Sequence, residues 1–183
     1  MVKKISGLLE GHVVKLVRSI YCYKNLNKNM FYNFKSKVPK DFALKSMDED
    51  LYNKYASEID PSYSDIWGSS DQFLERGFGF CILHNGEFIS ACNTFYVGHG
   101  CAEIDIMTKS EHRGQGFATI TCSAFIEHCL NYELIPTWDA DLGNEPSNKL
   151  ALKLGFEKEK DISILWWHEN AEIIKSYLTK YNY

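Results

Sequence analysis

The stretch "TKSEHRGQGFATIT", residues 108–121, decides the fold. It follows a run of alternating polar and apolar residues and precedes a run with helical periodicity. A glycine-rich turn between a strand and a helix leaves backbone N–H groups at the positive end of the helix dipole. The stretch therefore predicts a phosphate-binding turn, and the kind of phosphate is the next question.

The spacing of the glycines excludes two common nucleotide sites. A Walker A loop has the pattern GxxxxGK followed by Ser or Thr, and a dinucleotide fingerprint has the pattern GxGxxG. In this sequence Gly114 and Gly116 are separated by one residue, and Thr119 stands where the dinucleotide fingerprint has its third glycine. The GK pair of a Walker A loop is absent as well, so neither pattern is met. On the glycines alone, a turn without any ligand stays open as an alternative.

The sequence before the turn predicts an antiparallel meander. Residues alternate with period two over 78–83, 88–97 and 101–108, and the turns "HNGE" and "GHG" separate the three runs. Upstream, capping boxes predict two short helices, one starting at Ser46 and the other between Ser69 and Gly77.

The N-terminal part predicts a further helix. Apolar residues over 7–23 recur at helical spacing, and an Asn-, Lys- and aromatic-rich stretch ending at Pro39 is typical of a linker. Up to residue 40 the chain carries nine Lys or Arg against Glu10 alone. We interpret this as a basic helical extension that folds against an acidic body; contact with nucleic acid is the alternative.

The sequence after the turn predicts alternating helices and strands. Helices are expected at 115–132, from Pro146 to Gly155, and at 170–181, and strands at 135–140 and 157–168.

Composition limits the class of protein. A chain of 183 residues with 45% hydrophobic content is expected to form one compact domain. No signal peptide or membrane span is indicated, so we expect a cytoplasmic protein that does not contact a membrane. The six cysteines form no CxxC pair, which favours reduced, mostly buried thiols and no metal site.

Two motifs together resemble the GCN5-related N-acetyltransferase (GNAT) superfamily. Residues 113–118, "RGQGFA", fit the acyl-CoA-binding pattern Gln/Arg-x-x-Gly-x-Gly/Ala between the fourth strand and the next helix. The block "NEPSNKLALKLGF", residues 144–156, is similar to the later family block, an Asn that opens a helix ending in Leu-Gly-Phe. The resemblance covers about residues 42–168 and is strongest to a bacterial branch of GNAT acetyltransferases.

The resemblance implies an α/β fold of the α+β type. It has a mixed, mainly antiparallel central sheet flanked by helices, and splayed central strands bind acyl-CoA. We expect residues 1–41 to form the basic extension and residues 42–183 to form the acetyltransferase domain.

The resemblance also implies a set of residues that bind acetyl-CoA. Backbone N–H groups of 114–118 hold the pyrophosphate, and Arg113 adds a charge or orders the turn. Asn144 hydrogen-bonds the pantetheine arm, although a helix N-cap is an equal alternative. The complete set of cofactor-binding residues is Met107, Thr108, Arg113, Gly114, Gln115, Gly116, Phe117, Ala118, Asn144 and Ser147.

The candidate bases lie on the strand 101–108. Glu103 and Asp105 share the face opposite Ala102 and Ile104, with Glu103 as the first choice and Asp105 as the reserve. A solvated sheet face is the alternative. The resemblance places the oxyanion donor at a backbone N–H near Met107 or Thr108.

The remaining positions are less specific. Many family members have a thiolate-protonating Tyr where this chain has Ala151. Trp138 is a candidate for lining the acceptor pocket, with a place in the core as the alternative.

We therefore expect acetyl transfer from acetyl-CoA to a primary amine of a small molecule or peptide. The alternatives are a non-catalytic acyl-CoA-binding domain and an acetyltransferase that acts on a charged tRNA or a protein. Nucleic acid is not the expected partner, and a homodimer is left open.

Overall fold

The computed structural model describes residues 12–23 and 28–183. The chain divides into two compact units: unit 1 consists of residues 1–24 with 138–183, and unit 2 consists of residues 25–137. Among the described residues, seven strands follow the order β2-β3-β4-β5-β6-β1-β7. Every neighbouring pair is antiparallel except β5 with β6. This mixed, mainly antiparallel sheet with flanking helices confirms the predicted fold class.

Unit 2 contains the predicted meander and its helices. In chain order its elements are α2 (Lys28–Lys35), β2 (Ala43–Ser46), α3 (Glu49–Glu58), α4 (Ser62–Trp67), α5 (Ser70–Arg76), β3 (Gly79–His84), β4 (Glu87–Gly98), β5 (Cys101–Thr108), the 3-10 helix η1 (Ser110–His112), α6 (Phe117–Asn131) and the first three residues of β6 (Ile135–Asp141).

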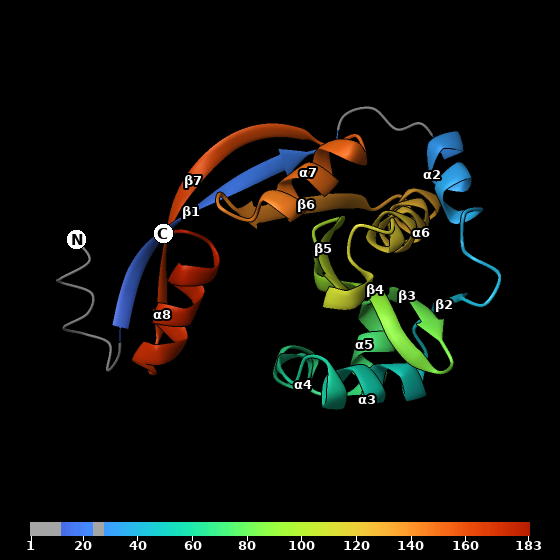
Figure 1. Ribbon diagram of the computed structural model, residues 1–183, viewed down its shortest axis with the longest axis horizontal. Helices are drawn as coiled ribbons and strands as arrows, with labels where there is room; N and C mark the ends of the chain where they lie inside the picture. Colours follow the sequence, from blue (N-terminus) through green and yellow to red (C-terminus); the bar gives the residue numbers. More distant parts are fainter. Residues whose placement is uncertain (1–11, 24–27) are drawn as a thin grey trace. The chain divides into compact units, whose positions relative to one another are not determined.

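Two helical layers cover opposite faces of the meander in unit 2 (Figure 1). On one face, α3, α4 and α5 bury an aromatic core that includes Tyr55, Tyr63 and Phe73. On the other face, Phe117 and Ile120 of α6 pack on Ile82 and other residues of the sheet. The glycine turn thus connects the sheet to α6. The first turn of α6, which contains Phe117 and Ile120, packs directly on that sheet.

Unit 1 contains the remaining strands and two helices. Its elements are β1 (His12–Cys22), the last four residues of β6, α7 (Glu145–Lys153), β7 (Glu157–His168) and α8 (Ala171–Lys180). The strand β1 pairs with β7 along its whole length and with β6 at Arg18–Tyr21. Helix α8 lies alongside β1 and β7 (Figure 1).

The predicted N-terminal helix over 7–23 is wrong where the structure describes it. Residues 12–22 form β1, and the part of the prediction before residue 12 lies outside the described residues. The β-branched residues Val13, Val14, Val17 and Ile20 explain this, because they lose χ1 freedom in a helix and fit a paired strand. The division of the chain into 1–41 and 42–183 stays a prediction.

Three smaller details also differ from the sequence-based expectation. The stretch interpreted as a linker contains α2, which packs on α6. Helix α3 is capped by the side chain of Asp48, which accepts from the backbone N–H of Leu51, and not by Ser46. Helix α4 was not expected. The N-cap Ser69 and the end of α5 at Gly77 are confirmed.

The basic N-terminal residues within the described part contact acidic side chains. In unit 1, Arg18 forms ion pairs with Asp139 and Asp141. In unit 2, Lys35 forms an ion pair with Glu127. The interpretation of residues 1–41 as a basic helical extension stays a prediction outside β1, which is a strand.

The cysteines are unbridged, and four of the six are buried, as predicted. No group of three or more His, Cys, Asp or Glu side chains suited to a metal ion occurs in residues 12–23 and 28–183. Within the same ranges, no helix is long and apolar enough to cross a membrane.

Candidate functional site

The glycine turn has the backbone geometry that its sequence predicts. Gly114 has a φ of 76° and Gly116 a φ of 90°, a region that L-residues with a side chain adopt only with strain. The short helix η1 precedes the glycines, and α6 begins directly after Gly116. Both glycines therefore let the chain turn from the sheet into α6 without the backbone strain that another residue would have there.

The turn also provides space and donors for an anion. A Cβ atom added at Gly114 or Gly116 would meet no other atom within 4 Å. Gly116 caps α6 without any side-chain hydrogen bond, and the first turn of α6 contains no acidic residue. Because the first N–H groups of a helix have no partner within it, those of Phe117 and Ala118 need an acceptor from outside α6. These residues fit a pyrophosphate.

Two side chains of the turn donate hydrogen bonds to backbone carbonyl groups of residues that precede it. The Nε of Arg113 donates to the carbonyl oxygen of Thr108 at 3.2 Å, and the Nε2 of Gln115 donates to that of Glu111 at 3.2 Å. The ring of Phe117 is buried, and its centroid lies 4.9 Å from that of Phe42.

The pairing of β5 distinguishes the two candidate oxyanion donors. The N–H of Lys109 donates to the carbonyl of Ile89, and hydrogen-bonded pairs alternate in an antiparallel ladder. In this register the pair Met107–Ala91 is hydrogen-bonded, whereas Thr108–Ser90 is not. The N–H of Met107 is therefore used by β4, and the N–H of Thr108 points away from β4.

Strands β5 and β6 pair over only a short length among the described residues. Their ladder comprises three parallel pairs, Cys101–Ile135, Ala102–Pro136 and Glu103–Thr137, all within unit 2. The ladder with β4 continues to Thr108. Beyond Glu103, the edge of β5 that faces away from β4 has no recorded ladder partner within the described residues.

A buried row of hydroxyl groups links the end of β5 to α6. The Oγ of Ser90 lies 2.9 Å from the Oγ1 of Thr108 and 3.1 Å from the Oγ1 of Thr121. Thr121 in turn donates to carbonyl oxygens in the first turn of α6, at Phe117 or Ala118. This network fixes the strand end relative to the helix N-terminus.

The two carboxylates of β5 lie on the predicted face but in different surroundings. Ala102 and Ile104 are buried on the opposite face. Glu103 lies opposite Thr137 of β6 and is half-buried. Asp105 is half-buried too, and its Oδ2 accepts a hydrogen bond from the hydroxyl of Tyr63 at 2.7 Å. Asp105 is therefore not on a simple solvated surface.

The later motif lies in unit 1 and has its own hydrogen bonds. The Oδ1 of Asn144 accepts from the backbone N–H of Ser147 at 3.4 Å, so Asn144 is the N-cap of α7. The Oγ of Ser147 accepts from the indole Nε1 of Trp138 at 3.1 Å. Trp138 is 2% exposed, and Ala151 is fully buried. The roles of Asn144, Ser147 and Trp138 in binding ligands stay predictions.

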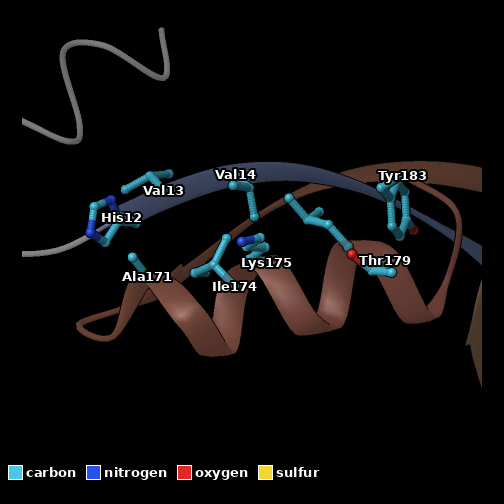
Figure 2. A pocket seen from close by; sticks show the side chains of 9 residues that line it. His12, Val13, Val14, Ala171, Ile174, Lys175, Thr179 and Tyr183 are labelled. Atoms are coloured by element: carbon cyan, nitrogen blue, oxygen red, sulfur yellow. The ribbon is translucent and has the colours of Figure 1, made fainter.

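Unit 1 also contains a cavity that no sequence motif indicated. It has a volume of about 470 Å³ and lies between β1 and α8, where Figure 2 shows His12, Lys175 and Tyr183 among its lining side chains. None of the predicted site residues lines it.

Comparisons of the sequence and of the structure with known proteins point to the same protein family. Residues 2–165 match the family model described as GNAT acetyltransferase. The chain belongs to the GNAT acetyltransferase family. A curated family relative, the uncharacterized N-acetyltransferase YdfB of Bacillus subtilis (strain 168), is 37% identical over 164 residues. The alignment covers 88% of this chain but only 60% of YdfB, so the chain spans less than two thirds of that relative.

Solved structures of the family share the fold. A GCN5-related N-acetyltransferase-like protein from Streptococcus suis 89/1591 matches 91% of this chain and 67% of its own, with a TM-score of 0.78 and 28% identity. A tandem GNAT protein from the clavulanic acid biosynthesis pathway matches 91% of this chain and 57% of its own, with a TM-score of 0.60. At 16% identity the latter shows the fold alone.

The residue that sequence reasoning missed is Tyr63. It lies in "PSYSDIW", a stretch that carries no catalytic motif. The local signal was the sequence Asp60-Pro61-Ser62, because a Pro in the first turn of a helix is favourable and would have indicated α4. Its contact with Asp105, 42 residues later, has no sequence signal.

Proposed function

We propose that the protein transfers an acetyl group from acetyl-CoA to a primary amine of a small molecule or a peptide. The observation that carries this proposal is the geometry of residues 113–118. An uncapped helix N-terminus, two glycines in the left-handed region and open space at both of their Cβ positions suit a pyrophosphate.

In this proposal the glycine turn and the end of β5 bind different parts of acetyl-CoA. The N–H groups of 114–118 hold the pyrophosphate of acetyl-CoA, and the N–H of Thr108 donates a hydrogen bond to the developing oxyanion of the thioester. The carboxylates on β5, Glu103 and Asp105, are the candidates for receiving the proton of the amine. Asn144 and Ser147 remain the candidates for the pantetheine arm.

The charge of the α3–α5 layer supports a cationic acceptor. Residues 46–76 carry two basic side chains, Lys54 and Arg76, and eight acidic ones: Asp48, Glu49, Asp50, Glu58, Asp60, Asp65, Asp71 and Glu75. Most of the acidic side chains are exposed. A surface of one sign concentrates ligands of the opposite sign, which here are protonated amines.

The test is release of free thiol from acetyl-CoA in the presence of a panel of amines. We expect thiol release that depends on the amine and an acetylated amine as the product, identified by mass spectrometry. Binding of acetyl-CoA without amine-dependent thiol for any acceptor would favour the non-catalytic alternative. The observation in favour of that alternative is the buried Ala151 at the position of the usual Tyr.

A further inference from the structure

The carboxylate of Asp105 is held by a residue from outside its own strand. Tyr63 of α4 donates from its hydroxyl to the Oδ2 of Asp105 at 2.7 Å. Tyr63 is 1% exposed, whereas Asp105 is only partly covered. The pair thus has one member fixed inside the α3–α5 layer and one member that solvent reaches.

Tyr63 itself is held in place by its neighbours in the aromatic core. Its ring makes an edge contact with Tyr55, with centroids 5.0 Å apart. Its backbone carbonyl accepts a hydrogen bond from the hydroxyl of Tyr52 at 3.0 Å. Because ring and backbone are both packed, the hydroxyl of Tyr63 is aimed at Asp105 without a large entropic cost.

The position of Asp105 on β5 differs from that of Glu103 in one important respect. Glu103 lies in the part of β5 that pairs with β6, whereas Asp105 lies two residues beyond the last recorded pair on the same face. Ile106 and Thr108 direct their N–H groups to the edge of β5 that faces away from β4, because their pairs with β4 are not hydrogen-bonded. A backbone hydrogen bond from Ile106 also reaches the carboxylate of Asp105. Asp105 is therefore the β5 carboxylate that lies closer along the strand to the proposed oxyanion donor, the N–H of Thr108.

The geometry points to Asp105 as the group that receives the proton of the acceptor amine, with Tyr63 as the residue that positions it. This inference rests on the proposed function and assigns one residue within it. Tyr63 does not touch the reacting atoms and acts only through Asp105.

The proton balance of the transfer is complete with these groups. Asp105 takes one proton from the ammonium group, and the neutral nitrogen forms a C–N bond with the thioester carbonyl carbon. The C–S bond breaks as the oxyanion collapses. The second proton of the nitrogen passes to the departing thiolate through water, and Asp105 returns its proton to solvent. The products are the amide, the free thiol of CoA and one proton.

The surroundings of Asp105 favour this role. Burial raises the pKa of Asp105, the hydrogen bond from Tyr63 opposes that rise, and the negative charge of Asp60 adds to it. The other titratable group on this face is Tyr55 on α3, and burial raises its pKa, so it stays neutral. Cys92 on β4 lies on the opposite face of the sheet, and burial raises the pKa of its thiol. A carboxylate with a raised pKa is a better proton acceptor than an exposed one.

The experiment compares Asp105→Asn, Tyr63→Phe and Glu103→Gln with the wild type in the pH profile of kcat. We expect Asp105→Asn to lower kcat by roughly 10²- to 10⁴-fold and to remove the ascending limb. Tyr63→Phe should lower kcat about tenfold and move the limb to higher pH, because the lost hydrogen bond had favoured the ionised carboxylate. The matched control is Tyr21→Phe, which removes a hydroxyl of another buried tyrosine that donates to Asn148 in unit 1, and its limb should not move.

A second measurement does not depend on turnover. The carboxyl carbon of Asp105 is followed by ¹³C NMR during a pH titration of the wild type and of Tyr63→Phe without substrates. We expect a higher midpoint in the variant, and equal midpoints would overturn the role of Tyr63. Loss of the limb in Glu103→Gln but not in Asp105→Asn would overturn the assignment of Asp105 while leaving acetyl transfer intact. Absence of amine-dependent thiol in the wild type would instead overturn the proposed function and this assignment with it.

Discussion

The Nε of Arg113 donates a hydrogen bond to the backbone carbonyl of Thr108 at 3.2 Å. This bond joins the first residue of the glycine motif to the last residue of β5. The guanidinium group is otherwise exposed. The sequence left open whether Arg113 contributes charge or order, and this contact indicates that order is at least one of its contributions.

Replacing Arg113 separates these two contributions. Arg113→Ala is expected to weaken acetyl-CoA binding about tenfold, the value of one hydrogen bond near a charged ligand. Arg113→Lys keeps the charge but has no planar fork to reach both Thr108 and a phosphate, so it should recover only part of the loss. Isothermal titration calorimetry measures both. Full recovery in the lysine variant would show that charge alone matters.

Gly116 is the position at which a side chain most directly tests the phosphate site. At about 100 times its Kd, acetyl-CoA should stabilise the native state by about 2.7 kcal/mol and raise Tm by several degrees. Gly116→Glu is expected to abolish this rise, because the added carboxylate enters the space and opposes the charge of the phosphate.

The matched control for Gly116→Glu is Gly86→Glu. Gly86 has a φ of 80° and an equally open Cβ position, but it lies in the turn between β3 and β4. Both variants therefore have a similar backbone cost, and only the first should lose the ligand-induced shift. If the two behave alike in the thermal assay, the turn at 113–118 is not where the phosphates bind.

The acidic α3–α5 layer predicts a salt-dependent preference among acceptors. Exposed charges are screened within about 8 Å at 0.15 M salt. The KM of a linear triamine should therefore rise several-fold as salt is increased, whereas that of an alkyl monoamine should change less. The double variant Asp65→Asn/Asp71→Asn should reduce the difference. Equal salt dependence for both amines would remove the support for a multiply charged acceptor.

His128 predicts an acid-sensitive component of stability. Its ring packs on Phe78 and Tyr132, with centroid distances of 4.2 and 4.4 Å, and burial lowers its pKa below the ordinary value for histidine, about 6.5. As the pH falls through 6.5, the unfolded chain binds the proton before the folded chain does, so the free energy of unfolding decreases.

The measurement for His128 is Tm as a function of pH in the wild type and in His128→Gln. Between about pH 7.5 and 5, the wild type should lose more Tm than the variant, because the variant lacks the titrating ring. If Tm falls with pH equally in the wild type and in the variant, the His128 ring has the same pKa in the folded and the unfolded chain.

Asp141 predicts a stabilising polar cluster in unit 1. Its carboxylate accepts hydrogen bonds from Tyr177 and from Tyr183, and Arg18 pairs with it at 3.4 Å. The Asp141 side chain is 4% exposed, whereas that of Asp139, which also pairs with Arg18, is 28% exposed. Asp141→Ala should therefore cost about 3 kcal/mol and Asp139→Ala about 1 kcal/mol or less, measured by urea unfolding. Equal costs would contradict the role of burial.

Most of the fold could be predicted because its signals are local. The turns around Gly86 and Gly100 and the alternation between them determine the meander without reference to distant residues. The glycines at 114 and 116 likewise indicate their own backbone conformation. In these places the local preference and the tertiary structure agree.

The N-terminal strand could not be predicted from periodicity because β1 is covered on both sides. A strand that pairs along both edges and buries residues of both faces, such as Leu16 and Ser19, has no clean alternation. Its apolar residues then coincide with helical spacing. The pairing with β7 joins residues that are 135 (Cys22–Glu157) to 156 (His12–His168) positions apart in the sequence, and no local signal reports it. Deleting residues 1–40 to test RNA binding would remove this strand, so such a test needs charge substitutions instead.

The candidate site likewise has parts that local sequence signals predict and parts that depend on tertiary packing. The turn was predicted from its own glycines, but the partner of Asp105 was not, because Tyr63 approaches it through tertiary packing. The alternation of β5 correctly placed Glu103 and Asp105 on one face. It could not show that the hydroxyl of Tyr63 donates to Asp105.

The open space at Gly114 and Gly116 has a consequence for how mutations at these positions are selected. A Cβ atom added there meets no other atom within 4 Å, so the cost of an alanine substitution to the fold is limited to the left-handed backbone, about 1–2 kcal/mol. At Gly79 and Gly143, by contrast, an added Cβ would collide with Asn93 and with the backbone of Tyr181. In a library scored for cellular abundance, variants of the first two glycines should survive and those of the last two should be depleted. Scored for growth that depends on the enzyme, all four should be lost.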